Sequence, residues 1–232
     1  MTLFVFDFDQ TLTSIHVFKF LAGWGAAAAG GGGPRALTER GQIYLAEHYE
    51  SMGSVFQYDG ADGLVRTAEN GENWSVAIFG GIDRLELLRG FLWKLVSKNC
   101  ELRVHTRGYV GAVRRCLSFV GLDQFFTEIW GHVRDKYAKS SEPALPFDTS
   151  AAAGGAHPFE GDVSFGKWKN KVSKLLDFRK DLGLFVEDVV FVEDDFEEVE
   201  LCEKCGAALT VFVEDRRGMT TVEMEKCLRL TK

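Results

Sequence analysis

Two aspartates stand one residue apart directly after the first apolar run of the chain. That run is LFVF, from Leu3 to Phe6, and Asp7 and Asp9 follow it. Side chains alternate along an extended strand, so both carboxylates can point the same way where the strand ends. Beside an apolar core, such a pair is repulsive and poorly hydrated unless a cation or a substrate compensates its charge. A solvated turn after the strand is the alternative interpretation.

A second acidic group follows another apolar run, VVFV at residues 189–192, and consists of Glu193, Asp194 and Asp195. Carboxylate oxygens are hard ligands that suit Mg²⁺, which takes few protein carboxylates and keeps several waters. The two acidic groups together therefore predict a magnesium site. Glu198 stands in the first turn of the next predicted helix, and we expect it only to complement the helix dipole.

A hydroxyl follows a third apolar run. The segment LRVH, at residues 102–105, precedes Thr106, Arg107 and Gly108. A hydroxyl at a strand end, with free backbone N–H groups at the start of the following helix, makes a corner that binds anions. Arg107 could contact the same anion. A simple helix cap at Thr106 and a solvent-facing arginine are the alternatives.

Several lysines gather where a further helix is predicted to begin, in the segment FGKWKNKVSKLL. Cations at a helix start oppose the helix dipole, so most of them are expected to form a solvated basic face. The lysine that lies nearest the acids is different, because a buried ammonium needs a negative partner. The four lysines are Lys167, Lys169, Lys171 and Lys174.

The elements that position these side chains alternate between strand and helix. This pattern implies right-handed βαβ units and a parallel sheet covered on both faces, a three-layer, Rossmann-like α/β fold. In such sheets the ligand site lies at the carboxyl ends of the strands, where these polar groups are placed. Strands are predicted at residues 3–6, 102–105, 127–130, 189–192 and 209–213, and helices at 83–98, 109–120, 170–180 and 196–204.

Two stretches interrupt the alternation. Residues 14–81 are too many for a crossover and predict an inserted cap, within which residues 25–34 are a Gly/Ala-rich loop. Residues 137–165 mix Ser, Pro, Ala and Gly and predict an extended loop. We therefore predict a core at 1–13 and 82–232 and a cap at 14–81. Trp24, Phe56 and Trp74 in the cap either line a pocket or form its small core.

The order of these features resembles the four-motif signature of the haloacid dehalogenase superfamily. The resemblance covers residues 1–13 and about 83–215, and FVFDFDQTLT closely resembles the first motif, a hydrophobic strand followed by DxDx(T/V). The segment KNKVSKLL is similar to the third-motif helix of phosphoserine-phosphatase-like members. The resemblance implies a Rossmann-like core and a small C1-type cap that closes over the site and largely sets substrate choice.

The resemblance also implies roles for individual residues. Asp7 would be the nucleophile that forms an aspartyl phosphate, and Asp9 the general acid and base. Because Asp9 must carry a proton in the first step, we expect Asp7 and Asp194 to raise its pKa. The implied phosphate-binding residues are Thr106, Arg107 and Lys169, with Lys167 in place of Lys169 as the alternative. The implied Mg²⁺ ligands are Asp7, Asp9, Asp194 and Asp195, with Glu193 in place of Asp195 as the alternative supporting acid.

Composition narrows the class of protein. The 232 residues are 46% hydrophobic, enough for one buried α/β domain with a modest insertion. A net charge of −7 argues against a nucleic-acid-binding surface. No apolar run approaches the roughly 20 residues that span a bilayer, and we expect no membrane partner. Five cysteines at no disulfide-framework spacing are typical of a reduced, cytoplasmic protein.

The sequence thus predicts a Mg²⁺-dependent phosphohydrolase, a phosphatase that acts on phosphate monoesters. Both a phosphorylated small molecule and a phosphoprotein are open as substrates. The main alternative is a non-catalytic module of the same fold that binds Mg²⁺ or a partner protein. A receiver-type signalling domain also uses an aspartate and Mg²⁺. There, however, the contiguous acids come early, whereas here Asp7 and Asp9 come first and the contiguous acids come late.

Overall fold

The strand β1 (Leu3–Phe6) lies in the middle of a parallel sheet in a computed structural model that describes residues 1–23, 36–58, 64–67, 71–132, 161–162 and 170–232. All four of its residues are fully buried. The neighbours are β4 (Glu101–Tyr109) and β7 (Val189–Glu193), with Phe6 level with Val104 on one side and Val192 on the other. A strand covered on both faces must be apolar throughout, which is why LFVF does not alternate.

The sheet has the strand order β6-β5-β4-β1-β7-β8, and every described pairing is parallel. The outer strands are β5 (Glu128–His132), β6 (Gly161–Asp162) and β8 (Leu209–Phe212). The predicted α/β class is confirmed. The predicted loop at 137–165 is wrong at β6, where residues 161–162 continue the sheet, and its other residues lie outside the described ranges.

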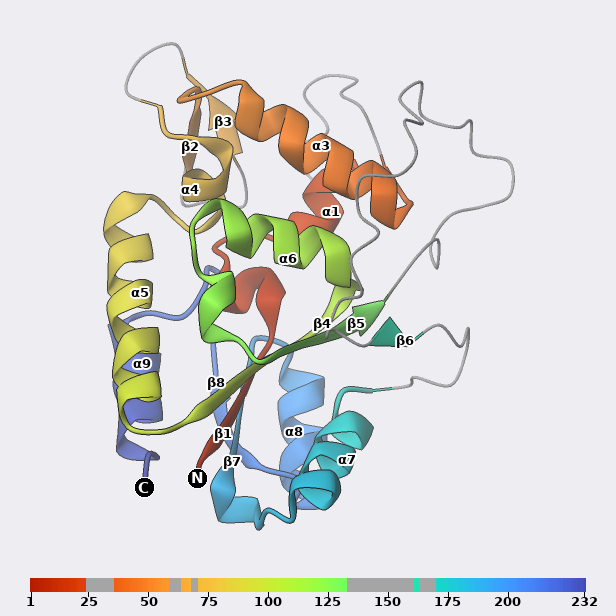
Figure 1. The fold of residues 1–232 in the computed structure, drawn as a ribbon, viewed down its shortest axis with the longest axis vertical. Helices are drawn as coiled ribbons and strands as arrows, with labels where there is room; N and C mark the ends of the chain where they lie inside the picture. The colour runs from red at the N-terminus through yellow and green to blue at the C-terminus, as the bar shows by residue number, and fades with distance from the viewer. Residues whose placement is uncertain (24–35, 59–63, 68–70, 133–160, 163–169) are drawn as a thin grey trace.

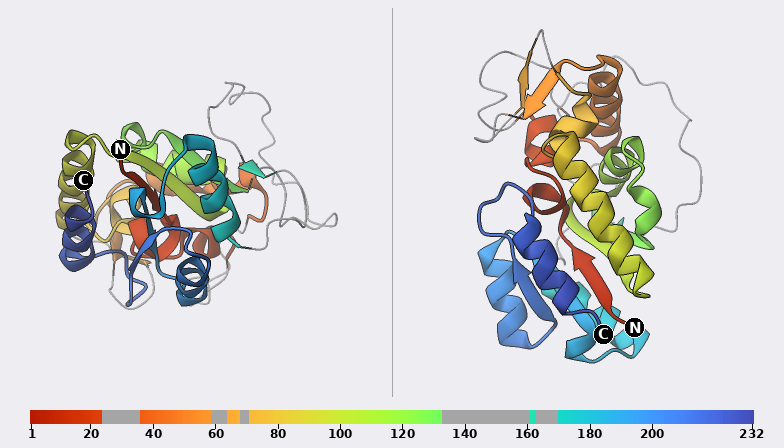
Figure 2. Two further views of the ribbon diagram at one scale, coloured as in Figure 1. Left: turned by 90° about the horizontal axis from the view of Figure 1, so that it is seen from below. Right: turned by 90° about the vertical axis from the view of Figure 1, so that its left-hand side faces the viewer.

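Helices cover both faces of the sheet, which makes three layers (Figures 1 and 2). Phe4 and Phe6 pack in one core with α5 (Ile82–Ser97), α6 (Val110–Phe119) and α9 (Thr221–Arg229). Leu3 and Val5 point to the other face and pack with α7 (Val172–Leu182) and α8 (Phe196–Cys205). Alternation along one buried strand therefore supplies both cores. Short 3₁₀ turns lie at Asp123–Phe125 and Val186–Asp188.

The described part of the segment between β1 and α5 contains the turn Phe8–Leu12 and, after it, five helices and strands, which Figure 1 shows above the carboxyl end of β1. Phe56 and Trp74 are buried there, and Tyr49 contacts both rings, so these side chains belong to a core. Trp24 and the Gly/Ala-rich residues 25–34 lie outside the described ranges. The division into core and cap stays a prediction. The elements are α1 (Val17–Leu21), α3 (Glu39–Ser51), β2 (Phe56–Tyr58), β3 (Leu64–Arg66) and α4 (Trp74–Ile78).

Two expectations from composition can be compared with the fold. No helix in the described part of the chain combines the length and the apolar character needed to cross a membrane. All five cysteines are free thiols, and four of them are buried. The cellular compartment stays a prediction.

Candidate active site

The carboxyl ends of the three central strands meet at one edge of the sheet. The backbone N–H of Asp7 donates to the carbonyl of Val192 at 2.9 Å, so the residue after β1 is held level with the end of β7. Asp7 then leads into the turn Phe8–Leu12, in which Gln10 takes the left-handed conformation with φ 62°. β4 continues past Thr106 to Tyr109, with an irregular register between His105 and Tyr109, so the predicted strand end at residue 105 is wrong. The topology therefore gathers residues that are far apart in the sequence, as expected of a parallel sheet.

Asp7, Glu193 and Asp194 form the acidic group of this edge. One carboxylate oxygen from each lies within 4.8 Å of the others, and the residues are 4%, 1% and 8% exposed. Burial raises the pKa of Asp7 to about 7, and the charges of Asp194 and Asp9 add to the increase while Lys171 opposes it. Burial also raises the pKa values of Glu193 and Asp194. Three buried carboxylates repel one another, so their ionised forms need nearby cations.

Lys171 is the cation within the acidic group. Its buried ammonium donates to Oδ1 of Asp7 and, at 2.6 Å, to Oε2 of Glu193. Burial alone would lower the pKa of Lys171, but the charges of Asp7 and Glu193 raise it above its ordinary value. The ammonium therefore stays charged. One buried positive charge against three carboxyl groups, with the exposed Arg216 at 3.7 Å from Asp194, still leaves room for a divalent cation.

Glu193 uses both of its carboxylate oxygens for hydrogen bonds within the acidic group and the turn that follows β7. Its Oε1 accepts the backbone N–H groups of Asp194 and Asp195 at 3.2 Å each, while Oε2 accepts Lys171. Both oxygens are thus used to shape the turn after β7 and to hold the lysine. Asp7 and Asp194 are less committed, since the contacts of Asp194 with Thr11 Oγ1 and Arg216 Nε are long, 3.4 and 3.7 Å. Asp7 and Asp194 are therefore the residues that could hold a metal ion.

Asp9 lies apart from the acidic group and contacts the start of α1. Its Oδ1 accepts the backbone N–H of Phe18 at 3.2 Å and lies 3.4 Å from Nδ1 of His16. Burial by itself would raise the pKa of Asp9, but the charge of His16 and hydrogen bonds from His16, Phe18 and Val17 lower it below the ordinary value. The expected increase is wrong, because His16 and the start of α1 stabilise the carboxylate more strongly than burial destabilises it.

Thr106 and Asp9 face the same small space. The Thr106 hydroxyl is fully buried and accepts the backbone N–H of Gly108 at 2.9 Å, which makes a local turn where the register of β4 shifts between His105 and Tyr109. A Cβ placed on Gly108 would lie 3.2 Å from Oγ1 of Thr106 and 3.7 Å from Oδ2 of Asp9. Because Gly108 has no side chain, Thr106 and Asp9 can both lie next to this position.

Arg107 and Asp195 lie at the rim. Arg107 is half-exposed, pairs with Glu198, and has Nη1 3.8 Å from Oδ2 of Asp195. Asp195 caps α8, because its Oδ1 accepts the backbone N–H of Glu197 at 3.0 Å, and it is not a member of the acidic group. The expectation that Glu198 serves only the helix dipole is wrong. It is buried, and its Oε2 accepts the backbone N–H of Lys171 at 2.9 Å.

The lysine that contacts Asp7 is Lys171, at the N-cap of α7. Lys167 and Lys169, which the family resemblance implies, lie outside the described residues. Sequence reasoning also missed His16, Glu193 as a holder of the lysine, and Glu198. A signal for Lys171 existed. It directly precedes Val172, the first buried residue of α7, so it stands where that helix meets the sheet edge.

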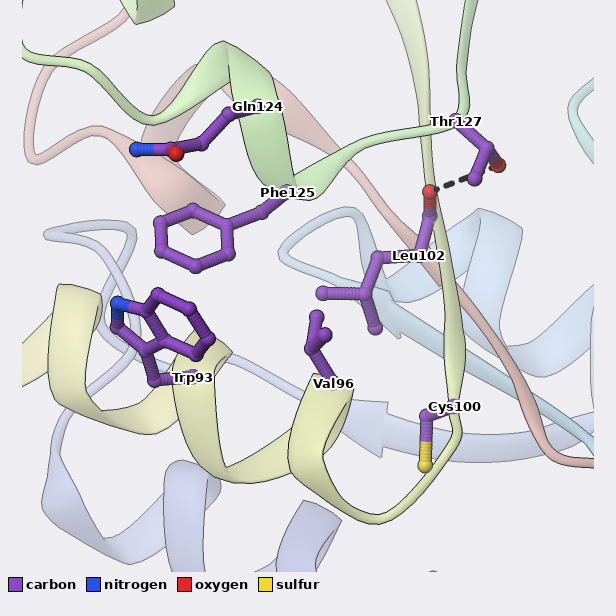
Figure 3. Close-up of a pocket in the computed structure, with 7 residues that line it drawn as sticks. All are labelled: Trp93, Val96, Cys100, Leu102, Gln124, Phe125 and Thr127. Atoms are coloured by element: carbon purple, nitrogen blue, oxygen red, sulfur yellow. Dashed lines mark hydrogen bonds between the residues drawn. The ribbon is translucent and has the colours of Figure 1, made fainter.

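A separate hollow of about 240 Å³ lies at the opposite end of the sheet, by the first residues of β4. Figure 3 shows the rings of Trp93 and Phe125 packed edge to face on one side of it, with Val96 and Leu102 beside them. Its lining is mainly apolar and includes none of the acids, so it is not a place for chemistry that depends on carboxylates.

This arrangement of strands and helices has counterparts among solved structures. The HAD domain of effector protein Lem4 from Legionella pneumophila matches with a TM-score of 0.51 at 11% identity, covering 100% of this chain and 95% of that one. An inactive mutant of the same domain matches with a TM-score of 0.52 at 11% identity, covering 100% and 94%. The chain has the haloacid dehalogenase (HAD) fold.

The HAD fold confirms the architecture that the sequence motifs predicted. At 11% identity the likeness is one of fold, and the roles of individual residues are proposals. Phosphoserine phosphatase in its apo form matches at 15% identity, covering 100% of this chain and 99% of that one, but its TM-score of 0.44 is too low to carry an argument. No family model and no curated protein matches the sequence.

Proposed function

We propose that this chain is a Mg²⁺-dependent phosphohydrolase that cleaves phosphate monoesters through an aspartyl phosphate on Asp7. The observation that supports this most directly is the environment of Asp7. Its Oδ1 is held by the ammonium of Lys171, and a second buried carboxylate, Asp194, lies beside it within the acidic group. A carboxylate fixed through one oxygen presents the other as a nucleophile.

In the first step the free oxygen of Asp7 bonds to phosphorus and the ester oxygen departs. Lys171 offsets the repulsion between the carboxylate and the phosphate dianion. The Thr106 turn and Arg107 stand at the strand ends where the phosphoryl oxygens would lie. Asp9 protonates the departing oxygen. Because its pKa is lowered in the free protein, Asp9 must take up a proton together with the substrate.

In the second step water attacks the phosphorus of the aspartyl phosphate. Asp9, now ionised, takes a proton from that water, the bond between phosphorus and the Asp7 oxygen breaks, and inorganic phosphate leaves. Asp7 returns to its carboxylate form. The contacts of Asp9 with Phe18 and His16 keep it ionised, which suits the base of this step.

The oxygens that fit Mg²⁺ are those of Asp7 and Asp194, because those of Glu193 are already used within the turn and by Lys171. When bound there, Mg²⁺ would neutralise phosphoryl charge. Asp9 and Asp195 were also expected as ligands. Their carboxylates are bound to α1 and to the start of α8 instead, so we leave them out of the proposed site.

The proposal is tested by Mg²⁺-dependent hydrolysis of an aryl phosphate and of a panel that includes phosphorylated small molecules and phosphopeptides. We expect turnover in the wild type that is lost with EDTA and with Asp7→Asn. Asp123→Asn, the same chemical change in a turn near the apolar hollow, is the matched control and should retain activity.

Two outcomes would count against the enzyme. Equal activity of wild type and Asp7→Asn would exclude the aspartyl phosphate. A folded wild type that binds Mg²⁺ but turns over no member of the panel would favour the non-catalytic module.

A further inference from the structure

Arg84, near the start of α5, donates hydrogen bonds to four main-chain carbonyls. Nη1 donates to Leu12 at 2.9 Å and to Phe79 at 2.6 Å. Nη2 donates to Thr11 at 3.3 Å and to Met219 at 3.2 Å. The planar guanidinium has five N–H donors in a fixed fork, so a single side chain can bind carbonyls from separate segments.

Two of the three segments that Arg84 joins, the turn after Asp7 and the loop after β8, contact Asp194, and the third packs on Phe8 through Phe79. Thr11 and Leu12 belong to the turn that follows Asp7, and Thr11 also contacts Asp194. Phe79 precedes α5, where the chain returns from the insertion, and Met219 follows β8. Three backbone hydrogen bonds cross the same junction. The N–H of Gly218 donates to the Gln10 carbonyl at 2.9 Å, that of Met219 to the Thr11 carbonyl at 2.8 Å, and that of Ser14 to the Ile78 carbonyl at 2.8 Å. Arg84 is thus the side chain common to this junction.

The backbone packs against the guanidinium too closely for a side chain to fit. A Cβ on Gly218, whose φ is +80°, would lie 2.1 Å from Nη2 of Arg84 and 2.7 Å from the carbonyl of Thr13. At Gly80, φ +87°, it would lie 2.4 Å from Oγ of Ser14 and 2.9 Å from Cδ of Arg84. Two glycines in conformations that other residues rarely adopt therefore surround one arginine.

Burial lowers the pKa of Arg84 to about 10, so the group is still charged at neutral pH. Its hydrogen bonds in the described structure all go to carbonyl oxygens rather than to carboxylates. Burying a cation destabilises the fold unless its N–H groups are hydrogen-bonded. Displacing any of these carbonyls from Arg84 would therefore cost free energy. Arg84 and the three segments therefore hold each other in a single arrangement.

We infer that Arg84 is a positioning residue that fixes the turn after Asp7 against the return of the insertion and the loop after β8. This inference rests on the proposed function for its effect on turnover, but not for its effect on loop order. Without the fork, the turn carrying Asp9 and Thr11 would move relative to Asp194. A displacement of about 1 Å in a catalytic constellation can cost about 100-fold in rate.

The test compares Arg84→Lys with Arg89→Lys. Lysine keeps the charge but cannot supply the fork. Arg89 lies on the same helix and contacts Glu86 and the Val120 carbonyl, so it controls for the chemical change. With the aryl phosphate and Mg²⁺, we expect kcat of Arg84→Lys to fall about 10- to 100-fold with little change in KM. Amide hydrogen exchange at Ser14, Gly218 and Met219 should speed up about tenfold or more, while α8 is unchanged.

Arg89→Lys should match the wild type in both measurements. Unchanged exchange at those three amides in Arg84→Lys would overturn the inference, whatever the turnover. Faster exchange with kcat per folded molecule unchanged would also overturn it, because Arg84 would then be merely structural. If the wild type has no phosphatase activity, the exchange measurement and the Mg²⁺ dissociation constant replace kcat. Weaker Mg²⁺ binding in Arg84→Lys alone then supports the inference, and equal binding overturns it.

Discussion

The ammonium of Lys171 binds the carboxylate of Asp7 across 164 residues of sequence. Both groups are buried, and Glu193 accepts a second hydrogen bond from the same ammonium at 2.6 Å. This contact joins the start of α7 to the ends of β1 and β7. It places the positive charge of the site next to the proposed nucleophile, and the charge balance of the acidic group depends on it.

Replacing Lys171 with Met should reduce turnover about 100- to 1,000-fold, because the proposed phosphoryl transfer loses its fixed cation. The variant should also be less stable at neutral pH, by about 3–5 kcal/mol before the acids take up protons, since it leaves buried carboxylates unpaired. Aryl phosphate kinetics and thermal unfolding measure the two effects. Lys169→Met is the matched comparison and should keep both turnover and stability. An inactive Lys169→Met beside an active Lys171→Met would instead favour Lys169, the lysine that the family resemblance implies.

In the metal-free protein, the contribution of Asp7 to stability should be lost as the pH rises from about 4 to about 7. The pKa of Asp7 is raised from 3.8 to about 7, so the folded protein holds a proton that the unfolded chain releases in this window. Stability from this group is complete below the lower value and is lost as the pH passes the upper one. The raised pKa of Glu193 acts in the same direction. Thermal unfolding midpoints of the wild type relative to Asp7→Asn, in EDTA across this range, measure the effect. The difference is needed because the buried His105, whose pKa burial lowers, changes stability in the opposite direction.

Mg²⁺ should reverse that trend, because the ion must displace the proton from Asp7. Its affinity is expected to rise about tenfold per pH unit until the carboxyl is ionised. The increase in unfolding midpoint caused by Mg²⁺ should therefore be larger at about pH 8 than at about pH 5.5. An increase of the same size at both values would show that Asp7 does not bind the ion.

Asp9 and Asp194 should have separable roles. Asp9→Asn is expected to reduce turnover about 100- to 10,000-fold and to leave Mg²⁺ affinity unchanged, because its carboxylate contacts α1. Asp194→Asn should weaken Mg²⁺ binding about tenfold or more. Titration calorimetry with Mg²⁺ distinguishes them, and a strong loss of affinity in Asp9→Asn would return this residue to the set of ligands.

Asp195→Asn gives the control for a change in the same turn. Its carboxylate caps α8, so the variant should lose at most about 1 kcal/mol of stability and bind Mg²⁺ as the wild type does.

Gly131→Ala should displace Thr106, which belongs to the proposed phosphate-binding site. The added Cβ would lie 2.8 Å from Cγ2 of Thr106 and 2.9 Å from the carbonyl of Gly108, so the turn must shift. We expect about 1–3 kcal/mol of destabilisation and a weaker competitive inhibition by inorganic phosphate. Gly90→Ala is the control. It is exposed in α5 with no atom within 4 Å of the added Cβ, and it should stabilise the protein by about 0.5–1 kcal/mol. Unchanged phosphate inhibition in Gly131→Ala would place the anion elsewhere.

Local pattern was sufficient for most of the core. The apolar runs at 3–6 and 189–192 became buried strands at those positions, because a strand covered on both faces needs apolar residues throughout. α9 could also have been predicted, since Thr220 and Glu223 form a capping box that the sequence shows as T-x-x-E. β6 is only two residues long and has no local signal, since it exists through its pairing with β5.

The sequence by itself determined the fold class and the presence of acids, a hydroxyl and a lysine at the strand ends. Tertiary structure decided that Lys171 meets Asp7, because the packing of α7 on the sheet sets where the N-cap residue of that helix lies. It also decided the protonation of Asp9, whose pKa depends on the partners supplied by α1. Charge interactions act through space, so residues distant in the sequence set the electrostatics of the site.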